Sequence, residues 1–188
     1  FRPTDWLMFR ASYNTGFRVP NFNQLFNGVT ESLINSASTG DPLRCPNGVV
    51  TSGVAGCVSI ASQNSNAVSR NRGNLNLDPE ESTQYSVGVV FQPSRHFSAS
   101  VDFWSINVDN VIDTPTLAEA LRYYSFFPQR IIRNSTTNII EAVDLQVGNL
   151  GSRRTQGIEV NVRGNFELGG GTISAGIEGT YLVKKKER

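Results

Sequence analysis

Hydrophobic and polar residues alternate along the neighbouring stretches 82–92 and 97–112, which are separated by the four residues 93–96. Successive side chains of a β-strand point to opposite faces, so this alternation predicts two strands, each with one apolar and one polar face. The apolar positions are Tyr85, Val87, Val89, Phe91, Phe97, Ala99, Val101 and Phe103. Pro93 lacks the amide hydrogen that a strand ladder needs, so residues 93–96 predict a tight turn and the pair an antiparallel hairpin.

The same period of two recurs along residues 5–14, 156–166 and 172–183, which gives five predicted strands. Long polar segments, residues 15–80 and 113–155, separate the strands at one end, whereas tight turns separate them at the other. Short turns at one end and long loops at the other are typical of outer-membrane β-barrels, whose long loops are extracellular. We therefore predict an all-β fold: an antiparallel up-and-down meander, forming one transmembrane barrel segment over residues 1–188.

The two long loops carry weaker signals of their own. Pro20 favours a short helix that runs to Phe26, and a second short helix is expected from Thr114 to about Tyr124. Short strands are predicted near residues 49–51 and 58–60, and alternation over 139–147 predicts a further extended segment. The charged run from Lys184 to Arg188 is interpreted as a solvated strand end.

Composition narrows the possible partners. The 188 residues include 17 basic and 16 acidic side chains, and this balance argues against nucleic acid, whose partners are markedly basic. No apolar run approaches the roughly 18 to 20 residues of a membrane-spanning helix. Five strands leave two unpaired edges and cannot enclose a lumen, so we expect a mature or excised piece of a larger barrel.

Candidate chemistry is sparse. The lone His96 lies in the predicted turn, so neither a catalytic triad nor a histidine-based metal site can be assembled, and no cofactor is expected. Cys45 and Cys57 lie close together in a polar loop. An oxidising compartment favours a disulfide between them, and two free thiols are the alternative.

Three segments stand out in this order along the chain: RASYNTGFRVPNFNQLF (10–26), GNLNLDPEESTQYSVGVVFQP (73–93) and NLGSRRTQGIEVNV (149–162). In this order they resemble the corresponding segments of TonB-dependent outer-membrane receptors. The resemblance implies a barrel of about 22 strands, filled by an N-terminal plug. It also implies import of a scarce nutrient such as an iron chelate, a vitamin or an oligosaccharide, driven by an energising complex that acts on the plug. Neither the plug nor the closing strands are expected within this chain.

Within this interpretation, polar-face charges are expected to face the plug, and loop side chains to contact a small extracellular ligand. The plug-facing candidates are Arg10, Arg163 and Glu178. The ligand-binding candidates are Arg18, Phe22, Phe26, Tyr123, Tyr124, Phe126 and Phe127. The expected location is the bacterial outer membrane, with the lipid bilayer around the apolar face.

A second hypothesis gives the same alternation a different meaning. A soluble or surface-exposed β-sandwich, acting in binding or adhesion, would bury its apolar faces against a second sheet. A barrel wall would instead expose Phe91, Val101, Val162 and Ile177 to lipid. The exposure of these four side chains therefore separates the two hypotheses.

Overall fold

The computed structural model describes residues 1–187, and the chain divides into two compact units. We name them the strand unit (Phe1–Val19, Pro79–Val111, Gly151–Arg188) and the loop unit (Pro20–Asp78, Ile112–Leu150). Arg188, the last residue of the predicted strand end, lies outside the described residues.

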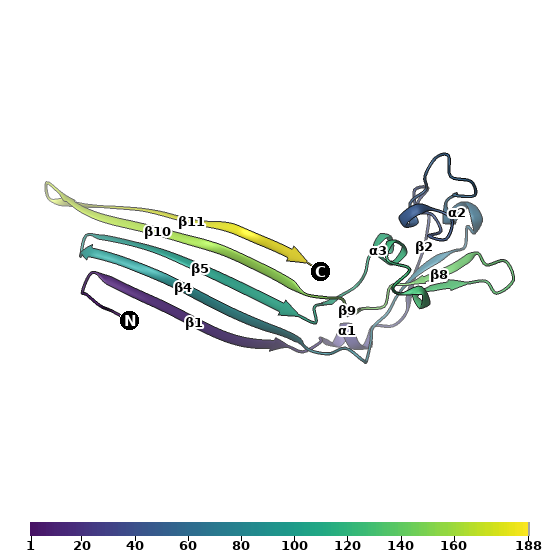
Figure 1. Cartoon of the computed structure of the whole chain (residues 1–188), viewed down its shortest axis with the longest axis horizontal. Helices are drawn as coiled ribbons and strands as arrows, with labels where there is room; N and C mark the ends of the chain where they lie inside the picture. Colours follow the sequence, from purple (N-terminus) through teal and green to yellow (C-terminus); the bar gives the residue numbers. More distant parts are fainter. Residues whose placement is uncertain (188) are drawn as a thin grey trace. The chain divides into compact units, whose positions relative to one another are not determined.

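One five-stranded antiparallel sheet makes up the strand unit (Figure 1). Its strands, in spatial order, are β1 (Leu7–Arg18), β4 (Glu80–Ser94), β5 (Phe97–Asp109), β10 (Arg153–Leu168) and β11 (Gly171–Glu187). Spatial order follows chain order, so the predicted up-and-down meander is confirmed. The sheet does not close, and β1 and β11 are its edges.

The tight turns lie where the sequence places them. β10 and β11 are joined by Gly169 and Gly170, whose φ angles of 55° and 96° suit the two-residue turns that close hairpins. β4 and β5 pair up to Ser94 and Phe97, with a register shift between Phe91 and Ser94. At the other end of the sheet, each strand connection passes through the loop unit.

Most strand bounds differ from the prediction. β1 runs from Leu7 to Arg18 rather than over residues 5–14, and β4 runs from Glu80 to Ser94 rather than over residues 82–92. β5 ends at Asp109, before Ile112, because Asn110 adopts a left-handed backbone conformation with φ of 56°. β10 begins at Arg153, three residues earlier than expected. The run from Lys184 to Glu187 is the exposed end of β11, so the strand continues beyond the predicted Val183 and pairs with the start of β10.

The two faces of the sheet match the alternation. Directly paired residues share a face, and one row across the sheet reads Phe9, Val89, Val101, Val160 and Gly179. This apolar face is open to its surroundings: Val101 is 51% exposed and Ile177 is 76% exposed. Phe91 is also exposed, and Val162 is half-buried. A β-sandwich would cover these side chains with a second sheet.

An ion pair crosses the polar face over an intervening strand. The next row reads Arg10, Gly88, Asp102, Glu159 and Thr180. Arg10 on β1 donates from Nε to Oδ1 of Asp102 on β5 at 2.7 Å, and its Nη2 also donates to Asp102 Oδ2. The two residues therefore meet across β4, which separates their strands.

Gly88 makes this pair sterically feasible. A Cβ atom at position 88 would lie 1.8 Å from Asp102 Oδ1 and 2.5 Å from its carboxyl carbon. Glycine normally weakens a strand interior. Here it leaves the space in which the carboxylate and the guanidinium come together.

The loop unit has its own small sheet and core. Its four-stranded sheet has the order β2 (Thr30–Leu33), β3 (Val68–Asn71), β8 (Ile140–Asp144) and β7 (Ile131–Arg133). A separate pair joins β6 (Ile112–Asp113) to β9 (Gly148–Asn149). The main hydrophobic cluster consists of Ile34, Ile60, Ala67, Ala120, Leu121, Ile131, Ile140, Val143 and Leu145.

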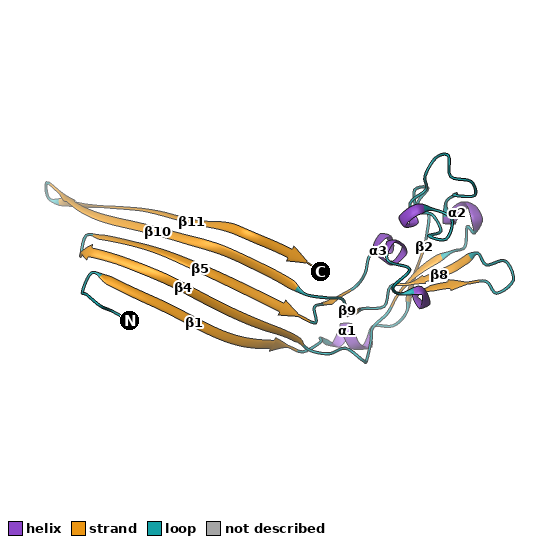
Figure 2. Cartoon of the chain, in the orientation of Figure 1, coloured by secondary structure: helices purple, strands orange, loops and turns teal. Residues whose placement is uncertain are grey.

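All helices of the described chain belong to the loop unit (Figure 2). They are α1 (Phe22–Phe26), α2 (Ile60–Gln63), α3 (Leu117–Arg122) and the 3₁₀ turns η1 (Pro46–Gly48) and η2 (Pro128–Arg130). The two expected short helices are α1 and α3. Each begins with a capping box, from Asn21 to Gln24 and from Thr116 to Glu119. No helix within residues 1–187 is long and apolar enough to cross a membrane.

The cysteine-containing segment folds differently from its prediction. No strand forms at residues 49–51 or 58–60; Val49 and Ser59 make only isolated bridges, to Thr39 and Gly40. Cys45 and Cys57 form a disulfide. The covalent link and turn hydrogen bonds hold this polar segment without a regular ladder.

A buried ion pair joins the cysteine-containing segment to β7. Asp41 is 1% exposed and accepts hydrogen bonds from both Nη atoms of Arg133 at 2.7 Å and from the Leu43 amide at 3.0 Å. Burial raises the pKa of Asp41, but these bonds, with the charges of Arg133 and Arg44, outweigh burial and lower it below its usual 3.8. The charged pair is thus favoured in the folded unit.

We predict that Asp41→Asn destabilises the loop unit by about 3 kcal/mol at pH 7, because it leaves Arg133 without its buried partner. Since the folded pKa is lowered, the carboxylate's contribution is complete above the ordinary value and is lost as the pH falls through the lowered one. Hydrogen exchange of loop-unit peptides in urea measures both effects in the intact protein. Glu31→Gln, in the exposed Arg70–Glu31 pair, should cost under about 1 kcal/mol; equal losses in both variants would contradict the prediction.

We predict that Gly88→Ala destabilises the strand unit by roughly 1 to 3 kcal/mol, because the new methyl group forces Arg10 and Asp102 apart. Urea unfolding of the intact protein in lipid checks this. The matched control is Gly176→Ala on the same polar face, where a Cβ would make ordinary contacts of 3.4 Å and 3.5 Å. A Gly88→Ala variant as stable as the control would show that the ion pair does not depend on the missing side chain.

Candidate functional site

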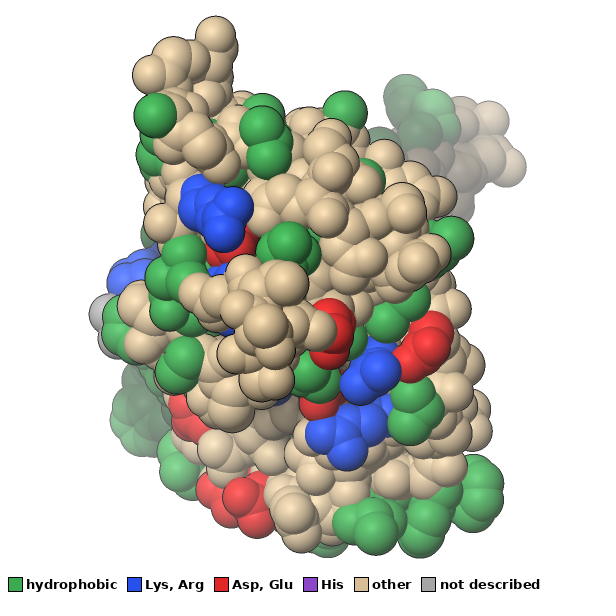
Figure 3. Space-filling model, turned by 90° about the vertical axis from the view of Figure 1, so that its right-hand side faces the viewer, with side chains coloured by type: hydrophobic (Ala, Val, Ile, Leu, Met, Phe, Trp, Pro, Cys, Tyr) green, Lys and Arg blue, Asp and Glu red, His purple; other side chains and the backbone are tan. Residues whose placement is uncertain are grey.

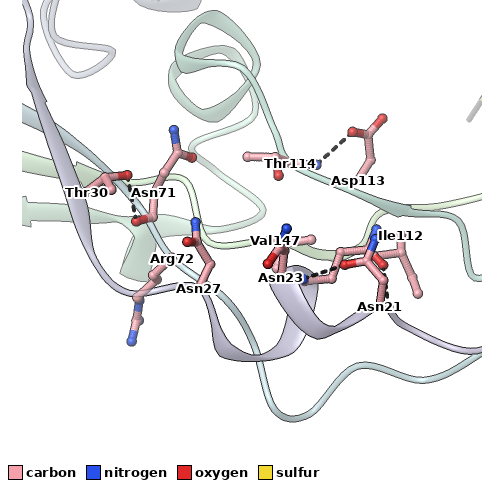
Figure 4. Close-up of a pocket in the computed structure, with 11 residues that line it drawn as sticks. Asn21, Asn23, Asn27, Thr30, Asn71, Arg72, Ile112, Asp113, Thr114 and Val147 are labelled. Atoms are coloured by element: carbon pink, nitrogen blue, oxygen red, sulfur yellow. Dashed lines mark hydrogen bonds between the residues drawn. The ribbon is translucent and has the colours of Figure 1, made fainter.

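The loop unit contains a polar pocket with a volume of about 510 Å³ (Figure 4). Its lining comes from α1 and its caps, from the strands β2 and β3, and from β6 with the residues that follow it. The lining residues are Asn21, Asn23, Gln24, Asn27, Thr30, Asn71, Arg72, Ile112, Asp113, Thr114 and Val147. The volume falls in the range of small-molecule sites.

The sequence folds into this pocket because α1 is anchored from two directions. Asn21 Oδ1 accepts from the Gln24 amide at 2.8 Å, and Gln24 Oε1 accepts from the Asn21 amide at 3.0 Å, which fixes the start of the helix. Gly73 donates its amide to Asn27 O at 2.9 Å. A Cβ atom on Gly73 would lie 2.6 Å from Leu25 O, so only glycine lets the two segments approach this closely.

Several lining groups are already engaged. Thr30 Oγ1 donates to Asn71 O at 3.4 Å, and the Thr114 amide donates to Asp113 Oδ1 at 2.8 Å. Arg72 pairs with Asp144 at 2.6 Å, and this hydrogen bond raises the pKa of Arg72 above its ordinary value. The guanidinium of Arg72 is therefore a permanent cation at the pocket wall.

Carboxamides supply the unengaged groups. Within the described chain, the side chains of Asn23, Asn27 and Asn71 make no hydrogen bond. Each can donate and accept. Together with Arg72 and Asp113, they suit a ligand rich in oxygen atoms, such as hydroxyl, carbonyl or carboxylate groups.

The sequence-predicted ligand residues lie elsewhere, and none of them lines the pocket. Phe22 and Phe26 contact each other with ring centroids 5.0 Å apart, and both are exposed. Arg18 belongs to the strand unit, where it pairs with Glu80. It is therefore neutralised by a neighbouring strand rather than free in a loop.

The aromatic residues that follow α3 divide into exposed and packed groups. Tyr123 and Phe126 are exposed, and Phe126 is 74% exposed. Phe127 is exposed beside the Arg130 guanidinium, whose carbon lies 5.8 Å from the ring centroid. Tyr124 instead packs against the hydrophobic cluster of the loop unit.

The plug-facing candidates share one face of the sheet. Arg163 pairs with Ser98 and Gly176, and Glu178 pairs with Asn161. By alternation, these positions lie on the polar face that carries Arg10. Arg10 differs from the other two because Asp102 already binds it.

On the surface viewed in Figure 3, charged side chains form small separate groups, and some blue and red groups lie next to each other. The loop unit's exposed pairs Arg70–Glu31 and Arg72–Asp144 are of this kind. Among residues 1–187, no cluster of three or more His, Cys, Asp or Glu side chains is arranged to hold a metal ion.

Sequence reasoning did not identify the pocket. Its residues lie between Asn21 and Val147, and only Ile112 and Val147 belong to stretches in which hydrophobic and polar residues alternate. The available signal was the concentration of asparagine around α1 and the segment 71–76, which also suits turns and caps.

Solved structures with a similar fold include siderophore receptors. The siderophore receptor PirA from Acinetobacter baumannii is 17% identical, with a TM-score of 0.61 over 97% of this chain and 21% of that chain. A mutant ferric enterobactin receptor PfeA from Pseudomonas aeruginosa, in complex with enterobactin, is 16% identical, with a TM-score of 0.61 over 98% and 21%. This chain thus spans about a fifth of their length.

No curated protein sequence matches the chain. A family model does: residues 1–184 match the model described as TonB dependent receptor-like, beta-barrel. This family is a class of bacterial outer-membrane transport receptors rather than enzymes. The match covers almost the whole chain, which therefore belongs to the TonB-dependent receptor β-barrel family.

Proposed function

We propose that the chain is a wall sector, with its extracellular loops, of an outer-membrane receptor that binds and imports a scarce nutrient, foremost a ferric siderophore. The observation that carries this proposal is a single-layer sheet with an uncovered apolar face, in a chain of the TonB-dependent receptor family. The apolar face contacts lipid and the polar face borders the lumen. Contact with lipid hydrocarbon is favourable for these apolar side chains, which would otherwise be exposed to water.

The polar face suits contact with a plug. Arg163 and Glu178 carry opposite charges on this face, and a closed lumen would desolvate them, so they favour charged or polar partners. Arg10 and Asp102 already satisfy each other. In the intact receptor, the partners of the polar face are the plug and the remaining barrel strands, and the TonB energising complex acts through the plug.

The ligand is proposed to meet the loop unit at two kinds of surface. Exposed rings such as Phe22, Phe26 and Phe126 offer apolar contact. The pocket offers amide donors and acceptors for an oxygen-rich ligand. Siderophore receptors are among the proteins of similar fold, which favours a ferric siderophore over a vitamin or an oligosaccharide.

We predict that Val101→Arg, halfway along β5, destabilises the intact receptor in lipid by roughly 2 to 4 kcal/mol, because it places a charge in hydrocarbon. Urea unfolding in lipid vesicles measures the loss. Val101→Leu, which keeps the position apolar, is the matched control and should change stability little. If Val101→Arg were tolerated within about 0.5 kcal/mol, as at a water-exposed position, the membrane placement would be wrong.

We predict that the double substitution Asn27→Ala and Asn71→Ala raises the half-saturating concentration for ferric siderophore uptake about tenfold, because each loses a hydrogen bond to the ligand. Uptake of radioactive iron is measured in iron-starved cells of a receptor-deleted strain that carries the variant. Asn66→Ala, an exposed carboxamide of the same unit outside the pocket, is the control.

Two outcomes would count against these assignments. Uptake by the double variant equal to that of the Asn66→Ala control would exclude the pocket. Deletion of the receptor without loss of uptake of any ferric siderophore, but with loss of a vitamin or an oligosaccharide, would exclude the siderophore class.

A further inference from the structure

Three cations lie on the apolar face of the sheet, at one end of β10 and β11. Arg154 pairs directly with Lys186, and Gln156 pairs with Lys184. By alternation along β10, Arg154 shares its face with Ile158 and Val160. Through these pairings, Lys184 and Lys186 lie on the same face as the apolar side chains. All three cations are exposed.

On the opposite, polar face of the same two strands, the cations lie close to a carboxylate. Arg153 Nε lies 3.0 Å from Glu187 Oε1, and Lys185 Nζ lies 3.8 Å from the same atom. Arg154, Lys184 and Lys186 take part in no salt bridge with any residue in the range 1–187. The positive charge is therefore paired with a carboxylate on the polar face. On the apolar face no carboxylate pairs with it, and Arg154 interacts with the uncharged hydroxyl group of Tyr85.

Two tyrosines lie in the same row across the sheet as Lys184. The row that contains Lys184 and Gln156 continues through Ser105 to Tyr85 and Tyr13. Tyrosine favours the boundary between hydrocarbon and water, where its ring is in lipid and its hydroxyl is in water. Lysine and arginine at such a boundary extend their charged ends towards the polar headgroups.

Acidic residues on the same face limit the cationic surface to one side of the sheet. Glu81 on β4 pairs with Asp109 on β5. On this face, their row is the next one after the row that contains Arg154 and Asn107. Both Glu81 and Asp109 are exposed, and Asp109 accepts from Asn107 Nδ2 at 2.9 Å. An anionic group would therefore bind over β10 and β11 rather than over β4 and β5.

The chain connections identify the leaflet. β10 begins at Arg153, three residues after the loop unit ends at Leu150, and Arg153 pairs with Glu187 at the end of β11. The cations thus lie at the end of the sheet from which the long loops arise. In a barrel of this kind that end is extracellular, so the headgroups there belong to the outer leaflet.

We propose that Arg154, Lys184 and Lys186 form a binding site for the phosphate groups of an anionic lipid in the outer leaflet. Arg154 can bind two phosphate oxygens at once, and the two lysines add point charges beside it. The adjacent apolar surface of Ile158 and Tyr181 receives the acyl chains. The inference rests on the membrane placement proposed above.

The test uses the intact receptor in detergent micelles, titrated with bisphosphorylated lipid A and followed by native mass spectrometry. The double variant R154Q/K186Q should bind the lipid about 25-fold more weakly than wild type, about fivefold for each cation. The control R153Q/K185Q also removes one arginine from β10 and one lysine from β11, but from the polar face, and should bind as wild type does. The single variants R154Q and K186Q report the loss where a double variant folds poorly.

Two further titrations identify the chemistry. Dephosphorylated lipid A should bind wild type and R154Q/K186Q equally, and inorganic phosphate should not displace the phosphorylated lipid. The proposal is overturned if both double variants lose binding equally, if neither does, or if free phosphate competes at the lipid's own concentration. Such a failure leaves the Val101→Arg result unchanged, so it is distinguishable from failure of the membrane placement.

Discussion

The two faces of one thin sheet meet different surroundings, and this constraint governs the strand unit. Side chains alternate with a period of two, so a strand keeps the same set of positions on each face unless its register shifts, as it does in β11 at Val183. The row through Val89, Val101 and Val160 and the row through Gly88, Asp102 and Glu159 are neighbours in sequence. They nevertheless lie on opposite surfaces, one apolar and one charged. A register slip of one residue in any strand would bring charge into hydrocarbon.

Charge on the polar face imposes a second constraint, which involves strands that are not neighbours. Arg10 and Asp102 are on β1 and β5, with β4 between them. Their pairing requires an intervening position without a side chain, and Gly88 provides it. A residue type that weakens strands is thus needed where two long polar side chains approach each other. The ion pair, the glycine and the registers of the β1–β4 and β4–β5 interfaces depend on one another, because each fixes the position of the others.

Alternation in the sequence was sufficient to predict the five strands of the sheet, since it is a local pattern. The up-and-down order followed from the tight turns at one end of the strands and the long loops at the other. It could not reveal the Arg10–Asp102 pair, because those residues are 92 positions apart and only the register brings them together. The loop unit was harder to predict. Its sheet contains the parallel pair β3–β8, and strands of three to five residues carry too few positions for a period to be recognised. The pocket depends on that packing, so its asparagines looked like ordinary turn and cap residues.

The end of β11 shows why hydropathy and parity must be considered separately. The lysine run has no apolar residue, so a pattern based on hydrophobicity ends the strand at Val183. The backbone ladder nevertheless continues to Glu187, because its hydrogen bonds do not depend on side-chain polarity. A register shift at Val183 then decides which lysines lie on each face. Lys184 and Lys186 lie on the apolar face with Tyr181, whereas Lys185 lies beside Glu187 on the polar face. A strand that leaves hydrocarbon at a membrane surface keeps its geometry while its chemistry changes from apolar to cationic, and the cations on the lipid side meet headgroups rather than protein.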